Sequence, residues 1–121
     1  YSSDFPYFRL ENPEKYVGFL VQEAHLKLRW HLDLRGDKLN LQKITSLLSK
    51  QKIDLFHYDS DKSYSGRKFA LEKLREKFSS NCIIIFDDIQ DNFHFRDWVK
   101  TEGLSYTVLE FQGKYVGVVG I

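Results

Sequence analysis

The sequence predicts an α/β fold in which a mostly parallel sheet is covered by helices on both faces. Strand-like and helix-like segments alternate along the chain, which indicates parallel strands joined by right-handed crossovers. Residues 82–86 read Cys-Ile-Ile-Ile-Phe and have no polar side chain on either face, as expected of a strand between two helical layers. Segments 106–111 and 115–119, joined at Gln112-Gly113, are typical of an antiparallel hairpin, which should add one antiparallel strand at a sheet edge.

The first part of the chain predicts two strands on either side of a helix. Residues 1–4 look like the end of a strand. Asn12 before Pro13 is typical of a helix N-terminus, and apolar side chains at helical spacing extend this helix to Ala24. Alternation over residues 28–34 predicts the second strand.

The next part predicts a helix, a strand and two more helices around strand 82–86. Asn40 is expected to cap a helix with a regular apolar stripe. The compact apolar run 53–58 predicts a buried strand, and a long helix follows it. The last predicted helix ends at Gly103. Three apolar residues are assigned to the inner face of the long helix: Leu71, Leu74 and Phe78.

The composition is that of an ordinary globular domain. The 121 residues include 42% hydrophobic and 29% charged side chains, which excludes a disordered chain. Lys and Arg total 18 against 17 for Asp and Glu, so no basic surplus points to nucleic acid or an anionic membrane. The single cysteine fits a reducing compartment, and a cytoplasmic location is expected. Without repeats or a Pro/Gly-rich linker, residues 1–121 are expected to form one domain.

Four aspartates follow the two buried strands. Asp59 and Asp61 come after the first of these strands, and Asp87 and Asp88 come directly after the second. Neighbouring strands lie ~5 Å apart, so at least three carboxylates should meet at the carboxyl edge of the sheet. Such a cluster must take up protons or hold a cation, and carboxylate oxygens suit Mg²⁺. An aspartate after a strand is also often a helix N-cap, and this alternative stays open for Asp61.

Other candidates for chemistry are weaker. His57 and His94 are better explained as packing or surface residues than as catalysts. Cys82 lies inside an apolar strand and lacks the basic surroundings that would activate a thiol.

The acidic motifs resemble those of class I S-adenosylmethionine-dependent methyltransferases, whose fold is Rossmann-like. The sequence Ile-Asp-Leu-Phe-His-Tyr-Asp-Ser-Asp-Lys-Ser-Tyr at 53–64 is similar to the segment after the family's fourth strand. Ile-Ile-Ile-Phe-Asp-Asp at 83–88 is similar to the family's fifth strand and the acids after it. The segment 107–121 resembles its closing hairpin. The resemblance is to small-molecule O-methyltransferases related to the macrocin and cephalosporin-pathway enzymes, and it covers essentially the whole chain.

The resemblance implies a magnesium site and a base. Asp59, Asp87 and Asp88 match the residues that hold Mg²⁺ in metal-dependent members, and Asp61 matches a residue proposed as general base. Lys62 stands where many relatives have histidine, which leaves proton transfer at that position in doubt. The implied reaction is Mg²⁺-assisted methyl transfer to a hydroxyl of a small molecule.

The resemblance also implies residues for S-adenosylmethionine. Asp4 matches the acid that binds the cofactor's ribose hydroxyls, and Asp37 lies where the family contacts adenine. The family's first strand and glycine-rich loop would precede Tyr1, so both are missing here. The chain also has no methionine, and a processed or partial product is expected. We therefore expect the C-terminal two-thirds of a methyltransferase, either part of a longer polypeptide or a rearranged sheet sealed by a second copy.

Two other functions stay open. A non-catalytic methyltransferase-like module for binding or dimerisation would tolerate the missing glycine-rich loop. A phosphoryl-transfer domain would also use aspartates around Mg²⁺, but it needs a lysine after a later strand. Lys114, in the predicted hairpin turn, fits that role poorly.

Overall fold

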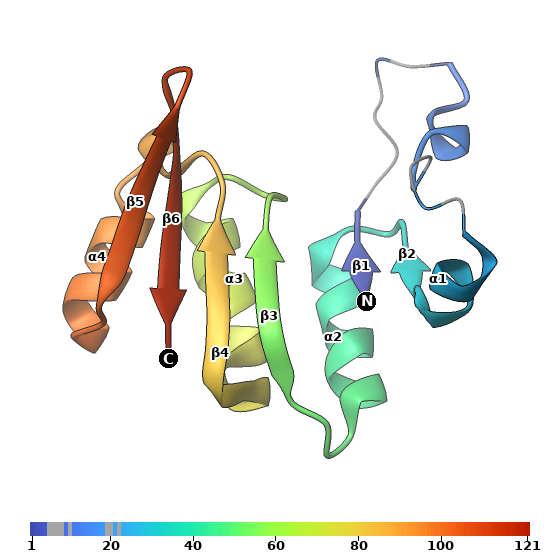
Figure 1. The fold of residues 1–121 in the computed structure, drawn as a ribbon, viewed down its shortest axis with the longest axis horizontal. Helices are drawn as coiled ribbons and strands as arrows, with labels where there is room; N and C mark the ends of the chain where they lie inside the picture. Colours follow the sequence, from blue (N-terminus) through green and yellow to red (C-terminus); the bar gives the residue numbers. More distant parts are fainter. Residues whose placement is uncertain (5–8, 10, 19–20, 22) are drawn as a thin grey trace. The chain divides into compact units, whose positions relative to one another are not determined.

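The computed structural model describes residues 1–4, 9, 11–18, 21 and 23–121 (Figure 1). The chain divides into two compact units, Tyr1–Ile44 and Thr45–Ile121. That residues 1–121 form one domain stays a prediction. In the described part of the chain, no helix is both long and apolar enough to cross a membrane.

The N-terminal unit contains a small parallel sheet. Strands β1 (Ser2–Ser3) and β2 (Leu32–Asp33) pair along both of their residues. Three helical segments complete the unit or begin in it: the 3₁₀ turn η1 (Pro13–Lys15), α1 (Ala24–Arg29) and α2 (Asp37–Leu48).

Two boundaries in this unit differ from the prediction. The segment after Asn12 forms only the 3₁₀ turn η1, and Asn12 makes no side-chain capping hydrogen bond. The predicted apolar continuation of that helix at Phe19 and Leu20 lies outside the described residues. The strand predicted over 28–34 is reduced to β2, because residues up to Arg29 are helical. A strand is no longer than the partner that supplies its hydrogen bonds, and β1 pairs through two residues.

Asn40 is not a helix cap. Helix α2 begins three residues earlier, and the Asn40 N–H donates to the carbonyl oxygen of Gly36. The Asn40 side chain is fully buried, and its Nδ2 donates to Ser3 Oγ at 2.9 Å and to the Asp33 carbonyl oxygen at 2.8 Å. Asn40 therefore joins α2 to both strands of the small sheet.

The C-terminal unit contains a four-stranded sheet in the order β3-β4-β6-β5. Its strands are β3 (Ile53–Tyr58), β4 (Phe78–Phe86), β5 (Tyr106–Phe111) and β6 (Lys114–Gly120). Strands β3 and β4 are parallel, and β6 runs opposite to both of its neighbours (Figure 1). A mixed α/β fold with a C-terminal antiparallel hairpin is thus confirmed.

The sequence predicted that the antiparallel strand lies at a sheet edge, and this prediction is wrong. Strand β6 lies between β4 and β5, and β5 forms the edge. Burial agrees with this order: Gly117 and Val119 of β6 are buried, whereas every residue of β5 is exposed. The arm of the hairpin inside the sheet is therefore the more buried of the two.

Helices α3 (Tyr64–Leu74) and α4 (His94–Glu102) connect the strands, together with the 3₁₀ turns η2 (Arg75–Lys77) and η3 (Ile89–Asp91). As predicted, α4 ends at Gly103, which has a left-handed conformation with φ 65°. Phe78, predicted on the long helix, instead starts β4, because η2 ends the helical segment and Phe78 pairs with Ile53.

The core of this unit is built around Phe86. Its ring is fully buried and lies 5.6–6.4 Å, between ring centroids, from aromatic rings on β3 and α4. These neighbouring rings are Phe56, Tyr58, His94, Phe95 and Trp98. The residue just before the predicted acidic pair is therefore anchored by the neighbouring strand β3 and by helix α4.

Candidate active site

Three of the predicted acidic residues meet at the carboxyl ends of β3 and β4. One oxygen from each of Asp59, Asp87 and Asp88 lies within 4.8 Å of the other two. The cause is the parallel register, which sets Tyr58 opposite Phe86 so that both strands end at the same level. The predicted convergence of carboxylates is therefore present for these three residues.

The turn after β4 is held from two sides. The Asp87 N–H donates to the Tyr58 carbonyl oxygen at 3.1 Å, which continues the pairing with β3. Arg67, in α3, is 1% exposed, and its Nη2 donates to the carbonyl oxygens of Asp87 and Asp88, both at 2.9 Å. Asp88 has a left-handed backbone with φ 49°, which these contacts support.

Two lysines approach the cluster. Lys62 Nζ forms an ion pair with Asp88 and lies 3.2 Å from Asp59 Oδ1. Lys114 Nζ lies 3.6 Å from Asp88 Oδ1. The hydrogen bond from Lys62 lowers the pKa of Asp88 against the opposing effect of burial, and the same bond raises the pKa of Lys62. In this structure an ammonium group therefore supplies the positive charge that the carboxylates require.

The part played by Lys114 was missed by sequence reasoning. It begins β6, and the interior position of β6 brings it beside the end of β4. No local sequence signal marks it, because its position depends on the strand order.

Asp61 does not belong to the three-carboxylate cluster. Its Oδ1 accepts a hydrogen bond from the Ser63 N–H at 3.0 Å, and its carbonyl oxygen accepts from Tyr58 Oη at 3.2 Å. The N-cap of α3 is Ser63, whose Oγ accepts from the Gly66 N–H at 3.0 Å. A Cβ atom at Gly66 would collide with the Asp61 carboxyl group, so this glycine allows the close approach. The role of Asp61 as base stays a prediction.

The two predicted cofactor residues lie together in the N-terminal unit. Asp4 follows β1, and its N–H donates to the Asp33 carbonyl oxygen at 3.0 Å. The Gly36 N–H donates to the Asp4 carbonyl oxygen at 3.2 Å, and Ser3 Oγ donates to Asp37 Oδ1 at 2.9 Å. Asp4 and Asp37 therefore lie at the carboxyl ends of two paired parallel strands, the edge where ligands bind in α/β sheets.

Asp33 is an acid that sequence reasoning passed over. Its carboxylate pairs with Arg35 at 2.6 Å and with Lys43 at 3.4 Å. The hydrogen bond from Arg35 holds the pKa of Asp33 well below its usual range. These contacts fasten the connection between β2 and α2, a structural role.

The donor set of the cluster fits a magnesium ion. All three groups are carboxylates, which are the hard oxygen ligands that Mg²⁺ prefers. Two ligands at about 2.1 Å from one ion lie at most about 4.2 Å apart, so the cluster needs only small side-chain rotations to bind it. Lys62 is the competing cation and would have to withdraw.

Comparisons with known proteins show the family and the fold of the chain. Residues 5–89 match a protein family described as "Methyltransferase domain". The fold is similar to the crystal structure of a Klebsiella pneumoniae protein described as a candidate O-methyltransferase, with a TM-score of 0.60 and 19% sequence identity. The match covers 91% of this chain and 58% of that one. No curated protein matches the chain.

Proposed function

Because this chain belongs to the family of methyltransferase domains, we propose that it serves S-adenosylmethionine-dependent, Mg²⁺-assisted methyl transfer to a hydroxyl group of a small molecule. The main support is the group of three carboxylates, Asp59, Asp87 and Asp88, at the carboxyl ends of two parallel strands. The chain spans 58% of the similar solved structure, so the activity of the whole protein is part of this proposal. We also propose that the protein is located in the cytoplasm.

For the cofactor, we assign Asp4 and Asp37. S-adenosylmethionine would supply the activated methyl group. Asp4 is exposed at the end of β1, where a carboxylate can accept hydrogen bonds from two ribose hydroxyls. The Asp37 carboxylate is oriented by Ser3, since Ser3 Oγ donates to its Oδ1.

For the acceptor, we assign the carboxylate cluster and Asp61. Mg²⁺ would lower the pKa of a bound hydroxyl. The Ser63 N–H donates to Asp61 Oδ1 and holds this carboxylate at the start of α3. We assign to Asp61 the role of general base, which takes the proton of the acceptor hydroxyl. The chain would supply orientation and a proton acceptor, which are the main needs of in-line methyl transfer.

The test is a titration of the protein with Mg²⁺ and with S-adenosylmethionine by isothermal calorimetry. Asp87→Asn should weaken Mg²⁺ binding at least about tenfold, because it removes a charged ligand. Asp91→Asn is the matched control, since Asp91 lies in the adjacent turn η3 outside the cluster, and it should bind Mg²⁺ like the unmodified protein. Equal Mg²⁺ affinities for the two variants, or no S-adenosylmethionine binding by a longer protein that also contains the glycine-rich loop, would overturn the proposal.

A second candidate is a non-catalytic methyltransferase-like module for binding or dimerisation. Lys62 favours it, because its ammonium already neutralises Asp59 and Asp88 without a metal. On this alternative, light scattering would give the mass of a homo-oligomer, and calorimetry would detect no Mg²⁺ binding at millimolar concentrations. A monomer that binds Mg²⁺ would exclude it.

A further inference from the structure

The two oxygens of the Asp88 carboxylate have different partners. Oδ2 accepts a hydrogen bond from Lys62 Nζ, and this nitrogen also lies 3.2 Å from Asp59 Oδ1. Because one nitrogen reaches both acids, Oδ2 is the Asp88 oxygen on the side of Asp59. Oδ1 accepts from Gln90 Nε2 at 3.2 Å and lies 3.6 Å from Lys114 Nζ. One oxygen of Asp88 therefore faces the cluster, and the other is bound from outside it.

Gln90 lies in η3, two residues after Asp88, and both ends of its side-chain amide are bonded. Its Oε1 accepts from the Tyr115 main-chain N–H at 3.1 Å. A main-chain N–H is a donor, so only the amide oxygen can bond to it, and the amide nitrogen must face Asp88. Because Tyr115 belongs to β6, Gln90 connects the Asp88 carboxylate to a strand of the sheet.

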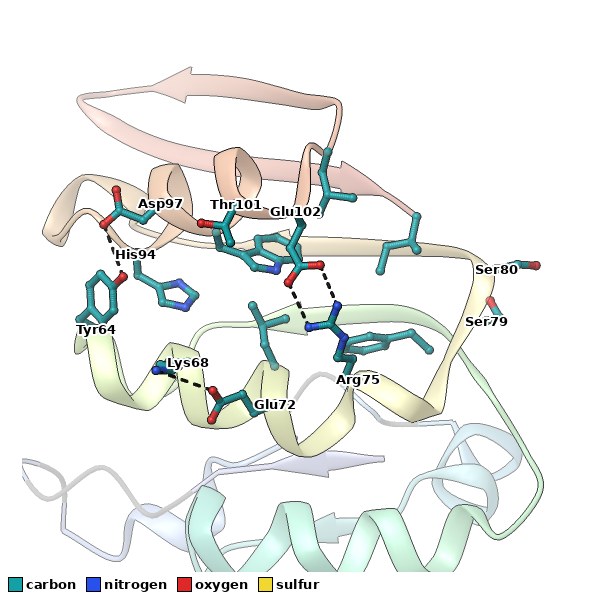
Figure 2. A pocket seen from close by; sticks show the side chains of 15 residues that line it. Tyr64, Lys68, Glu72, Arg75, Ser79, Ser80, His94, Asp97, Thr101 and Glu102 are labelled. Carbon is teal, nitrogen blue, oxygen red and sulfur yellow. Dashed lines mark hydrogen bonds and ion pairs between the residues drawn. The ribbon is translucent and has the colours of Figure 1, made fainter.

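The polar contacts around the cavity beside α3 and α4 are of a different kind. Arg75 donates to both carboxylate oxygens of Glu102, at 3.0 and 2.7 Å, and the Tyr64 hydroxyl donates to Asp97 Oδ2 at 3.4 Å (Figure 2). All four residues line this cavity, and none of the three cluster acids does. Loss of such a contact should affect stability without changing the affinity of the cluster for a metal.

The partners of Oδ1 leave Asp88 one oxygen for an ion. A carboxylate oxygen has about two acceptor positions, and Gln90 Nε2 and Lys114 Nζ approach Oδ1 as two donors. Oδ2 is paired with Lys62, the cation that a metal must displace. The side chain of Asp88 is 9% exposed, so water can replace few of these partners. An ion among the three acids would therefore meet Asp88 through Oδ2.

Coordination through one oxygen distinguishes Mg²⁺ from Ca²⁺. Mg²⁺ requires nearly ideal octahedral geometry at about 2.0–2.1 Å, whereas Ca²⁺ takes about six to eight oxygens at about 2.3–2.6 Å and accepts both oxygens of one carboxylate. Hydrogen bonds to a ligand carboxylate typically change metal affinity by about 10–100-fold. A carboxylate held with one oxygen toward the ion is thus better suited to Mg²⁺.

We propose that Gln90 is a positioning residue, which holds Asp88 as a one-oxygen metal ligand and thereby favours Mg²⁺ over Ca²⁺. The inference rests on the proposed function, because it concerns the ion bound by Asp59, Asp87 and Asp88. Gln90 supplies neither a charge nor a ligand atom. Its amide, fixed by β6, determines which oxygen of Asp88 faces the ion.

The test is calorimetric titration of Gln90→Met with Mg²⁺ and, separately, with Ca²⁺. Methionine keeps the length of the side chain but can make neither amide hydrogen bond. The Mg²⁺ affinity should fall about tenfold. The Ca²⁺ affinity should fall about threefold or less, because Ca²⁺ can use both oxygens of the released carboxylate. Gln51→Met makes the same exchange at an exposed residue before β3, at the end of that strand opposite the cluster, and should change neither affinity.

Hydrogen exchange at the Tyr115 amide distinguishes this role from a purely structural one. Gln90→Met should speed this exchange, because the Tyr115 N–H loses its acceptor. Unchanged exchange would overturn the inference, and so would faster exchange with an unchanged ratio of Mg²⁺ to Ca²⁺ affinity. Gln90 is exposed, so the midpoint of urea unfolding should stay nearly the same, which shows that the variant is folded.

Failure of this inference can be told apart from failure of the proposed function. If the unmodified protein binds Mg²⁺ and Gln90→Met keeps the same ratio of affinities, the positioning role is wrong and the proposed function stands. If the unmodified protein binds no Mg²⁺, the proposed function is wrong, and the positioning role is overturned with it.

Discussion

Arg67 donates a hydrogen bond from Nη2 to the main-chain carbonyl oxygen of Asp88, at 2.9 Å. The same nitrogen donates to the carbonyl oxygen of Asp87. A buried side chain of α3 thus holds the main chain of two of the three clustered acids. Arg67 therefore fixes the main chain from which the Asp87 and Asp88 carboxylates extend.

Arg67→Met should lower both stability and metal affinity. The substitution keeps the side-chain length but removes both hydrogen bonds, and we expect the free energy of unfolding to fall by about 2 kcal/mol. Urea unfolding measures this change. Arg75→Met is the control, because Arg75 is exposed and its ion pair with Glu102 should contribute less than about 1 kcal/mol. Equal losses in the two variants would contradict the role given to Arg67.

Lys62→Met should strengthen Mg²⁺ binding by about tenfold, which corresponds to about 1.4 kcal/mol. The reason is competition: the ammonium of Lys62 pairs with Asp59 and Asp88, and a metal must displace it. Calorimetry with Mg²⁺ provides the measurement. Lys68→Met is the control. It removes an equal charge, but Lys68 forms its ion pair with Glu72 and not with the cluster, so the Mg²⁺ affinity should change little. A weaker affinity in Lys62→Met would mean that the lysine helps to hold the site together.

Stability should fall as the pH falls from about 6.5 to about 4, because of His94. Its pKa is lowered to about 4 in the folded protein from an ordinary value of 6.5. Within this window the unfolded chain binds a proton that the folded protein does not, so acid favours unfolding. Between pH 7 and about pH 4.5 the loss should be about 2 kcal/mol.

Urea unfolding at the two pH values checks this expectation. His94→Gln should remove most of the pH dependence in this window. His57→Gln replaces an exposed histidine of β3 and should retain it. An unchanged pH dependence in His94→Gln would show that another group is responsible.

Two glycines of β6 should respond differently to alanine. A Cβ at Gly117 would collide with the ring of Phe95, whereas a Cβ at Gly120 meets no described atom within 4 Å. Since the Phe95 ring packs against Phe86 and Trp98, Gly117→Ala should cost about 1–3 kcal/mol. Gly120→Ala should cost less than about 0.5 kcal/mol. Thermal unfolding of the two variants tests the difference, and similar melting temperatures would contradict it.

The strands that carry the acidic cluster could be predicted because their signals are local. Strand β4 contains a run of apolar residues, and the acids follow it directly in the sequence. The convergence of Asp59 with Asp87 then requires only that consecutive parallel strands be neighbours, which is the common arrangement. Residue type and order were enough for this part of the site.

The features that sequence reasoning missed depend on tertiary context. Asn is a common residue at helix N-caps, but the side-chain amide of Asn40 donates hydrogen bonds elsewhere. One acceptor is Ser3 Oγ, which is distant in sequence, and the other is the Asp33 carbonyl oxygen, across the turn between β2 and α2. Lys114 reaches Asp88 only because β6 inserts beside β4. Strand order is set by the competition among hydrophobic surfaces for burial, and a pattern read along one segment does not report it.

The interior position of β6 makes β5 dependent on a strand synthesised after it. Strand β5 is hydrogen-bonded to β6, and β6 in turn to β4. A stop codon shortly before Lys114 would therefore detach two strands while deleting one. During translation, β5, which begins at Tyr106, would have no hydrogen-bonded partner until β6 had been synthesised. An unpaired strand can pair with other chains, so the chain should be prone to aggregation during this interval.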